Sequence, residues 1–278
     1  QDAVVQLLIE RGADVNYRAP SREGAASALQ AALDVPDFKE AHLNIIRQLI
    51  RHGANVKGRN SAGRSPLLFA ADHGRWEAAG DLIKNGADVN EADLKGGFPL
   101  LIAACNGYDQ LVGLLLEKGA SPAMTSLDGQ TPLMCACRGG HGGTVSLLLD
   151  NGANVNTKTA AGATALTEAT RTGDVAIAQL LLARGADHSG GYVPGAFKTL
   201  RGRAVAVNKK KIKKISDVLG MLSKAAVQDG YTINYDIKKM GQKTTMKAKG
   251  PWNKLLNDLT VKNRFVLVVK DKSITILP

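Results

Sequence analysis

A short motif recurs along the first two thirds of this chain at a nearly fixed interval. This glycine motif, five residues long and GADVN in its first copy, begins at Gly12, Gly53, Gly86, Gly119, Gly152 and Gly185. The intervals between its glycines are 41, 33, 33, 33 and 33 residues. A fixed period of that size is typical of stacked supersecondary units, each of which buries its apolar face against its neighbours.

Within each period the pattern predicts a helix, a tight turn, a second helix and an extended loop. Ser65–Pro66–Leu67 and Thr131–Pro132–Leu133 are expected to begin first helices. A hydroxyl side chain caps free backbone amides there, and proline suits the first helical turn. Second helices carry apolar pairs such as Leu115–Leu116 and end at the motif glycine, which supplies a left-handed C-terminal cap.

These residues resemble the ankyrin repeat, whose signature is a TPLHxAA helix start and an LLxxGADVN ending. The best copy is Thr131–His141 followed by Leu147–Asn156. Six copies cover residues 1–189, so the resemblance implies an α-solenoid. The first copy holds only its second helix, so we expect the natural protein to continue upstream. The second copy is eight residues longer than the period, with the extra length around Asp34–Lys39, and such insertions map to loops on one face.

The resemblance implies a binding surface without catalysis, formed by loop tips and the exposed side of the first helices. The tips fall near residues 61–64, 94–97, 127–130 and 160–163. The implied protein-binding residues are Arg64, Asp72, His73, Lys95, Asn106, Gln130, Arg138 and Arg171. Three of them, all arginines, would form a row of cations, or else are ordinary solvated residues. Trp76 begins a second helix where the pattern expects Leu, which favours a packing role.

The charge of the chain is concentrated at its C-terminal end. Residues 198–278 hold 19 Lys and Arg against 5 Asp and Glu, whereas the whole chain has a net charge of +11. This asymmetry indicates an anionic partner for the basic part. One patch is formed by Lys209, Lys210, Lys211, Lys213 and Lys214. It is either a solvated turn or a contact for an acidic protein, anionic lipid or nucleic acid.

A second domain is predicted over residues 204–278, after a Gly- and Pro-containing linker at 190–203. Apolar runs and alternation predict strands at 204–207, 231–235, 243–249, 264–270 and 273–277. Helical spacing predicts one helix over 215–227 and another that begins at Pro251. The fold class expected for the chain is therefore an α-solenoid of ankyrin repeats plus a small α/β domain of order βαββαββ.

This second domain resembles the short N-terminal (STN, N0-type) domain of secretins and TonB-dependent receptors. The segments that carry the resemblance are Ile215–Leu222, Gly230–Asp236, Lys243–Gly250, Pro251–Leu259 and the closing hairpin to Ile276. The resemblance implies a periplasmic scaffold subunit of a Gram-negative envelope machine, of secretin, pilus or type IV secretion type. Its partners would be proteins of an envelope-spanning complex, repeated around a ring. The alternative is a cytoplasmic ankyrin-repeat protein whose basic domain binds nucleic acid.

The sequence offers no arrangement of residues for catalysis, so no catalytic residue, cofactor or metal is expected. The five histidines are scattered over separate repeats, and the motifs for a serine nucleophile, a zinc pair and a phosphate loop are missing. The cysteines are Cys105, Cys135 and Cys137. An odd number without regular spacing predicts buried small residues and no disulfide framework.

Overall fold

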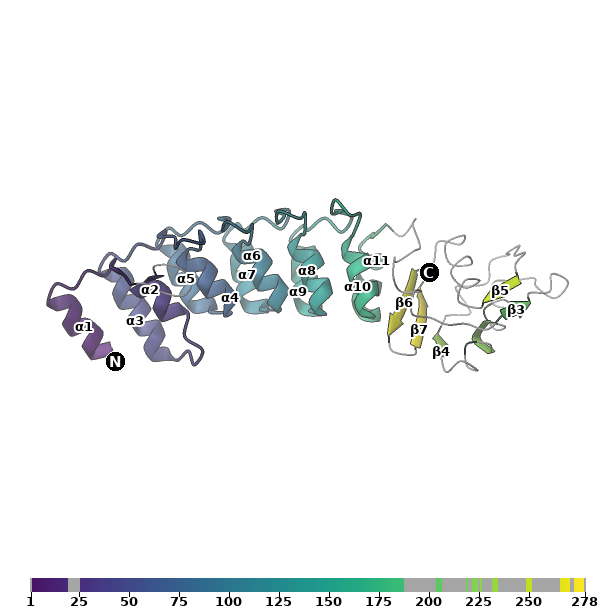
Figure 1. Ribbon diagram of the computed structural model, residues 1–278, viewed down its shortest axis with the longest axis horizontal. Coiled ribbons are helices and arrows are strands. Elements are labelled where there is room, and N and C mark those ends of the chain that lie inside the picture. The colour runs from purple at the N-terminus through teal and green to yellow at the C-terminus, as the bar shows by residue number, and fades with distance from the viewer. Residues whose placement is uncertain are drawn as a thin grey trace. The chain divides into compact units, whose positions relative to one another are not determined.

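The computed structural model describes two long stretches of the chain, residues 2–19 and 26–187. It also describes short segments at 204–206, 219, 222–224, 226, 232–234, 249–251, 266–270 and 273–277 (Figure 1). The chain divides into two compact units. The first contains residues 1–154 and 158–161, and the second contains residues 155–157 and 162–278.

The described helices follow the predicted order of first and second helices. In the first unit they are α1 (Asp2–Glu10), α2 (Ala28–Leu33), α3 (Glu40–Arg51), α4 (Pro66–Asp72), α5 (Trp76–Lys84), α6 (Pro99–Asn106), α7 (Asp109–Glu117), α8 (Pro132–Gly139) and α9 (Gly142–Asp150). The second unit holds α10 (Ala165–Thr172) and α11 (Val175–Ala183), which pack against each other. A short antiparallel pair, β1 (Arg18–Ala19) and β2 (Ala26–Ser27), precedes α2.

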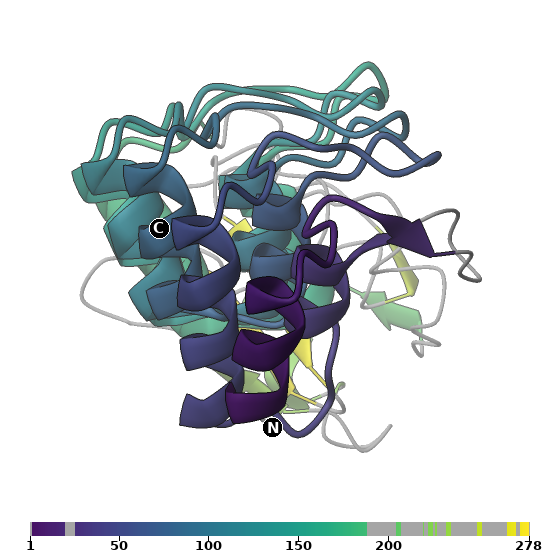
Figure 2. The same cartoon turned by 90° about the vertical axis from the view of Figure 1, so that its left-hand side faces the viewer.

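The helices of the first unit form two layers, and the loops between repeats gather along one edge (Figure 2). First helices α2, α4, α6 and α8 stack on one another, as do second helices α1, α3, α5, α7 and α9. Alanines at the contacts of the first helices, such as Ala70, Ala103 and Ala136, are fully buried. Leu82 and Leu115 fill the space between the layers. Small side chains in one layer and large ones between layers let the repeats pack closely.

The predicted caps are confirmed. The Ser65 hydroxyl accepts a hydrogen bond from the Leu68 amide, and the Thr131 hydroxyl accepts one from the Met134 amide at 3.2 Å. The motif glycines have positive φ angles, for example 93° at Gly86. That conformation lets each second helix end in a left-handed turn without a clash of Cβ with the backbone.

An asparagine at the last position of the glycine motif joins one repeat to the next. Asn16 accepts the Asn55 amide at 2.7 Å and donates to the carbonyl oxygen of the next motif glycine at 3.0 Å. Asn90 makes the same two bonds, to the Ser121 amide at 2.9 Å and the Gly119 carbonyl at 3.2 Å. Asn156 repeats them inside the second unit. We call these contacts the asparagine ladder.

Residues that precede the second helices make another set of links between repeats. Arg75 donates to the Val35 carbonyl at 2.9 Å, and the Tyr108 hydroxyl donates to the Asp72 carbonyl at 3.3 Å. The His141 ring lies 3.1 Å from the carbonyl oxygen of Cys105. Three unlike side chains thus bond backbone carbonyls at, or just after, the end of the first helix in the preceding repeat. His141 thus supports the turn between α8 and α9 from the preceding repeat.

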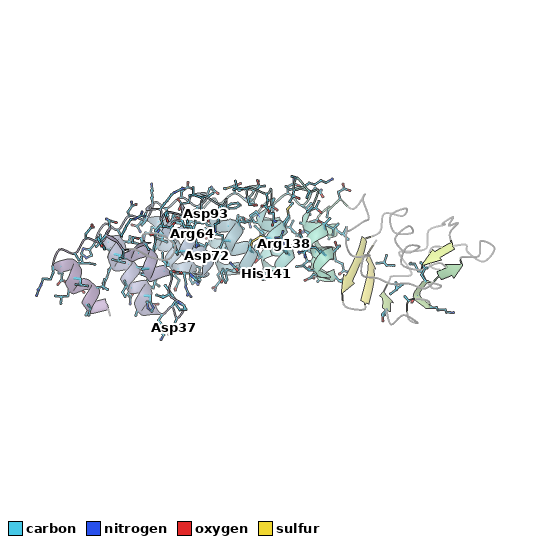
Figure 3. All side chains as sticks on the ribbon, in the orientation of Figure 1. Asp37, Arg64, Asp72, Asp93, Arg138 and His141 are labelled. Atoms are coloured by element: carbon cyan, nitrogen blue, oxygen red, sulfur yellow. A yellow bond between two sulfur atoms is a disulfide. The ribbon has the colours of Figure 1, made fainter. Side chains whose placement is uncertain are left out.

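The eight-residue insertion lies between α2 and α3. Figure 3 places Asp37 of this segment at the opposite end of the repeats from Asp93, which belongs to a hairpin tip. The following repeat holds the segment in place: His73 lies 3.0 Å from Asp34, and the Arg75 guanidinium lies 4.5 Å from the centre of the Phe38 ring. The insertion therefore extends the turn between two helices and not a hairpin tip.

Several strands of the second unit lie where the sequence predicts them. Strand β3 (Ala204–Ala206) pairs with β5 (Lys249–Pro251), while β7 (Ser273–Leu277) lies between β4 (Thr232–Asn234) and β6 (Val266–Lys270). The β4–β7 pair is parallel, and the β6–β7 pair is antiparallel, as expected for the closing hairpin.

Two predictions for this unit need comment. The prediction that Pro251 begins a helix is wrong, since Pro251 ends β5 opposite Ala204, where a missing N–H is tolerated at the end of a strand. The linker at 190–203, the lysine patch and the second helix lie outside the described residues. The 215–227 helix is described only in pieces, so the α/β domain stays a prediction.

We expect Asn90→Ala to destabilise the protein by about 1–2 kcal/mol, because it removes two hydrogen bonds between neighbouring repeats. Chemical unfolding followed by circular dichroism measures this change. The matched control is Asn85→Ala, since within the described residues the Asn85 side chain bonds only the Asp81 carbonyl at its own helix end. Equal effects of the two substitutions would contradict a coupling role for the ladder.

Candidate functional site

The candidate site is a protein-binding surface on the first unit, made of hairpin tips and first helices. Each tip is a five-residue turn, as at Asn60–Arg64, Asp93–Gly97 and Ser126–Gln130, and its first side chain bonds the amides that follow. The Asp93 carboxylate accepts the amides of Lys95 at 2.9 Å and Gly97 at 2.8 Å. These bonds fix the tips in one conformation without any partner.

Two leucines project from consecutive tips. Leu94 is 72 % exposed and Leu127 is 81 % exposed. Each packs over a glycine of the preceding tip, because a Cβ atom on Gly63 would lie 2.9 Å from Leu94 and one on Gly96 would lie 2.7 Å from Leu127. The Leu94 amide also donates to the Ala62 carbonyl at 3.2 Å. The tips therefore form a continuous strip with an apolar ridge.

The structure does not leave the three predicted arginines as a row of unpaired cations. Arg64 forms an ion pair with Asp72 and lies 4.6 Å from the centre of the Phe69 ring, so its side chain is only 16 % exposed (Figure 3). Arg171, in the second unit, donates to the Glu168 carboxylate at 2.8 Å. Arg171 pairs with Glu168 three residues earlier on the same helix, a spacing that the sequence itself offers, whereas Arg64 meets Asp72 only through the fold of its repeat.

Arg138 belongs to a polar network at the third tip. It donates to the amide oxygen of Gln130, whose own nitrogen donates to Asp128 at 2.8 Å. The hydrogen bond from the Ser126 hydroxyl is the main reason why the pKa of Asp128 lies below its usual value, and hydrogen bonds from Gln130 add to this effect. Because the pKa of Asp128 is lower in the folded chain than in the unfolded chain, its carboxylate stabilises the fold at pH values above the unfolded pKa. This contribution is lost as the pH falls through the folded pKa.

Of the other predicted residues, His73 contacts Asp34, and Asn106 bonds the Ile102 carbonyl of its own helix at 3.0 Å. The Lys95 side chain is exposed and makes no hydrogen bond or ion pair within the described residues. Lys95, Leu94 and Leu127 are therefore the side chains of the strip that are most available to a partner.

The prediction for the cysteines needs correction. Cys105 of α6 and Cys135 of α8 form a disulfide with a Cα–Cα distance of 4.7 Å, while Cys137 is fully buried and takes no part in it. The 33-residue period of the sequence contained a signal for this disulfide. Arg138 is the residue 33 positions after Cys105, and Cys135 precedes it by three residues. Positions three apart share a helix face, so the two thiols meet across the stacked first helices.

The second-helix face carries a groove of about 590 Å³ beside Trp76. Ile83, Leu114, Lys84 and Lys118 also line it. Trp76 is 42 % exposed, so the prediction of a packing role for it is wrong in part. Within the described residues, no helix has the length and apolar character of a membrane span, and no cluster of three or more His, Cys, Asp or Glu side chains is arranged for a metal ion.

We expect the paired substitution of Cys105 and Cys135 by serine to destabilise the protein by about 2–4 kcal/mol, because the disulfide closes a loop across two repeats. Unfolding midpoints with and without a reductant measure this. Reductant should lower the midpoint of the wild-type protein and leave that of the double variant unchanged. A wild-type midpoint insensitive to reductant would contradict the contribution of the disulfide.

Comparison with known families agrees with this geometry. A family model described as ankyrin repeats (3 copies) matches residues 1–93 and 100–190. No curated protein matches the chain significantly.

Proposed function

Because the chain belongs to the ankyrin-repeat family, whose members serve generally in protein–protein interaction, we propose that its tip strip holds a partner protein. The observation that carries the proposal is the apolar ridge of Leu94 and Leu127, which are 72 % and 81 % exposed on consecutive, rigid tips. Exposed apolar side chains on a preorganised surface favour binding, since little conformational entropy is lost on association. We assign no catalytic role to the chain.

Replacement of both ridge leucines by serine is expected to weaken partner binding by roughly tenfold or more, as for central apolar residues of an interface. The measurement is recovery of crosslinked proteins from native cells, quantified by mass spectrometry. Trp76→Ala serves as the control, because it removes an exposed apolar side chain from the second-helix face. A partner recovered equally by wild-type protein and the leucine variant would overturn the proposal.

We further propose that the protein works in an oxidising compartment, as a periplasmic scaffold of an envelope machine. The resemblance of residues 204–278 to secretin N0-type domains suggests docking to proteins of that machine. The Cys105–Cys135 disulfide supports the compartment, since disulfides persist in the bacterial periplasm and are rare in the cytoplasm. The alternative, a cytoplasmic protein with a nucleic-acid-binding domain, is favoured by the excess of basic residues in the same segment.

Two measurements separate these proposals. Alkylation after rapid denaturation of native cells exposes buried thiols, so it should find Cys105 and Cys135 protected from the reagent only if they are disulfide-bonded, as expected in the periplasm. Labelling of both thiols favours the cytoplasmic alternative. That alternative also predicts that the full chain binds DNA with an affinity that falls steeply as the salt concentration rises. Replacement of the lysine patch by glutamine should reduce this affinity.

A further inference from the structure

A small polar pocket lies at the start of the loops that join the first repeats. Its volume is about 320 Å³, and its lining is Asn16, Arg18, Ser27, Asn55, Lys57, Gly58 and Arg59. Three of these residues carry positive charge and none carries negative charge. Arg18 and Arg59 occupy equivalent positions of consecutive repeats, two residues after the end of the glycine motif.

Lys57 stands at the ladder position, which holds asparagine in three of the six motif copies and alanine, Ala123, in another. It is the last residue of its motif, the position that Asn16 and Asn90 occupy in theirs. A lysine cannot accept the amide hydrogen bond that those residues accept. Instead its chain runs past Gly86, where an added Cβ atom would lie 3.6 Å from the lysine Cε. The substitution removes a structural link and adds a cation to the pocket.

Within the described residues, the charges of Lys57 and Arg18 are not compensated. Both residues are exposed, and neither charged group has a hydrogen-bond or ion-pair partner among the described residues. Arg59 differs, since its guanidinium donates to the Glu91 carboxylate and the Ala92 carbonyl, both at 3.1 Å. Because Glu91 is 7 % exposed, this pair holds Arg59 in place at the edge of the pocket. Counted over its described lining residues, the pocket therefore keeps an excess of two positive charges.

Neutral groups of the pocket are also fixed in position. Asn16 accepts the Asn55 amide, and the Asn55 side-chain oxygen accepts the Lys57 amide at 3.0 Å. The side-chain nitrogen of Asn55 is left as a donor without an acceptor in the described part of the chain. Ammonium, guanidinium and amide donors around one small volume match the oxygens of a carboxylate.

We infer that this pocket binds an acidic side chain from a glutamate- or aspartate-rich segment of the partner protein. The inference rests on the proposed protein-binding function and names the chemistry of the partner. The pocket is a second contact, separate from the leucine ridge. Its charge excess provides electrostatic attraction and orientation, and the two uncompensated cations supply the contacts.

The probe is a synthetic octaglutamate peptide, added to the full chain at physiological salt. A carbodiimide then joins peptide carboxylates to any lysine amine that they contact, and peptide mapping measures the yield at each lysine. Lys57 should crosslink more than Lys84, which is an exposed lysine on the second-helix face. Arg18→Gln should lower the yield at Lys57 by about three- to fivefold and leave Lys84 unchanged.

A second variant keeps the test informative if Arg18→Gln fails to fold. Lys57→Asn removes the cation and at the same time restores the ladder residue, so the unfolding midpoint should stay equal or rise. Its affinity for octaglutamate should fall by about three- to fivefold, measured by fluorescence anisotropy. Lys84→Gln removes the same charge elsewhere and should leave the affinity unchanged, and both variants keep the basic C-terminal segment intact.

Equal crosslinking of Lys57 and Lys84, or equal loss of affinity in Lys57→Asn and Lys84→Gln, would overturn the inference. The inference would also be overturned if inorganic phosphate protected the Lys57 amine from reaction while octaglutamate formed no crosslink to it. That result would assign the pocket to phosphate. None of these outcomes affects the leucine ridge, which the serine substitutions of Leu94 and Leu127 test separately.

Discussion

The structure of the first unit depends on the contact between neighbouring repeats. No repeat in such a stack buries its apolar face alone, so stability comes from each interface with the next repeat. Buried alanines bring the first helices together, and side chains that bond backbone groups of the adjacent repeat fix their relative position. Asn90 does this at the loops and Tyr108 at the turns between helices. A regular stack then holds the tips at a constant spacing.

This constraint explains why departures from the repeat are informative. A residue that links neighbouring repeats can be replaced only where the stack tolerates the loss of its hydrogen bonds. Lys57 interrupts the asparagine ladder and contributes a cation to a pocket. Cys105 and Cys135 replace ordinary first-helix residues and add a covalent link between α6 and α8. The insertion before α3 is held in place by contacts with His73 and Arg75.

The sequence predicted the elements that depend on local chemistry. Ser65, Thr131 and the motif glycines act on their own turns, so the bounds of the helices could be inferred from the pattern. Residues whose role depends on a neighbour from a distant part of the chain were harder to predict. Cys105 pairs with Cys135 across 30 residues of sequence, and the exposure of Trp76 depends on how α5 and α7 pack. Pro251 was assigned to a helix because pairing with Ala204 leaves no local signal.

The sequence by itself determined the ankyrin solenoid, the order of its helices and the concentration of positive charge toward the C-terminus. These follow from period, caps and composition, which are properties of neighbouring residues or of whole segments. Only the tertiary structure decided that Cys105 meets Cys135, that Leu94 and Leu127 form one ridge, and that Arg18, Lys57 and Arg59 line one pocket. The physical reason is that each grouping requires residues about one repeat apart to meet, and the stacking geometry alone sets which side chains face each other.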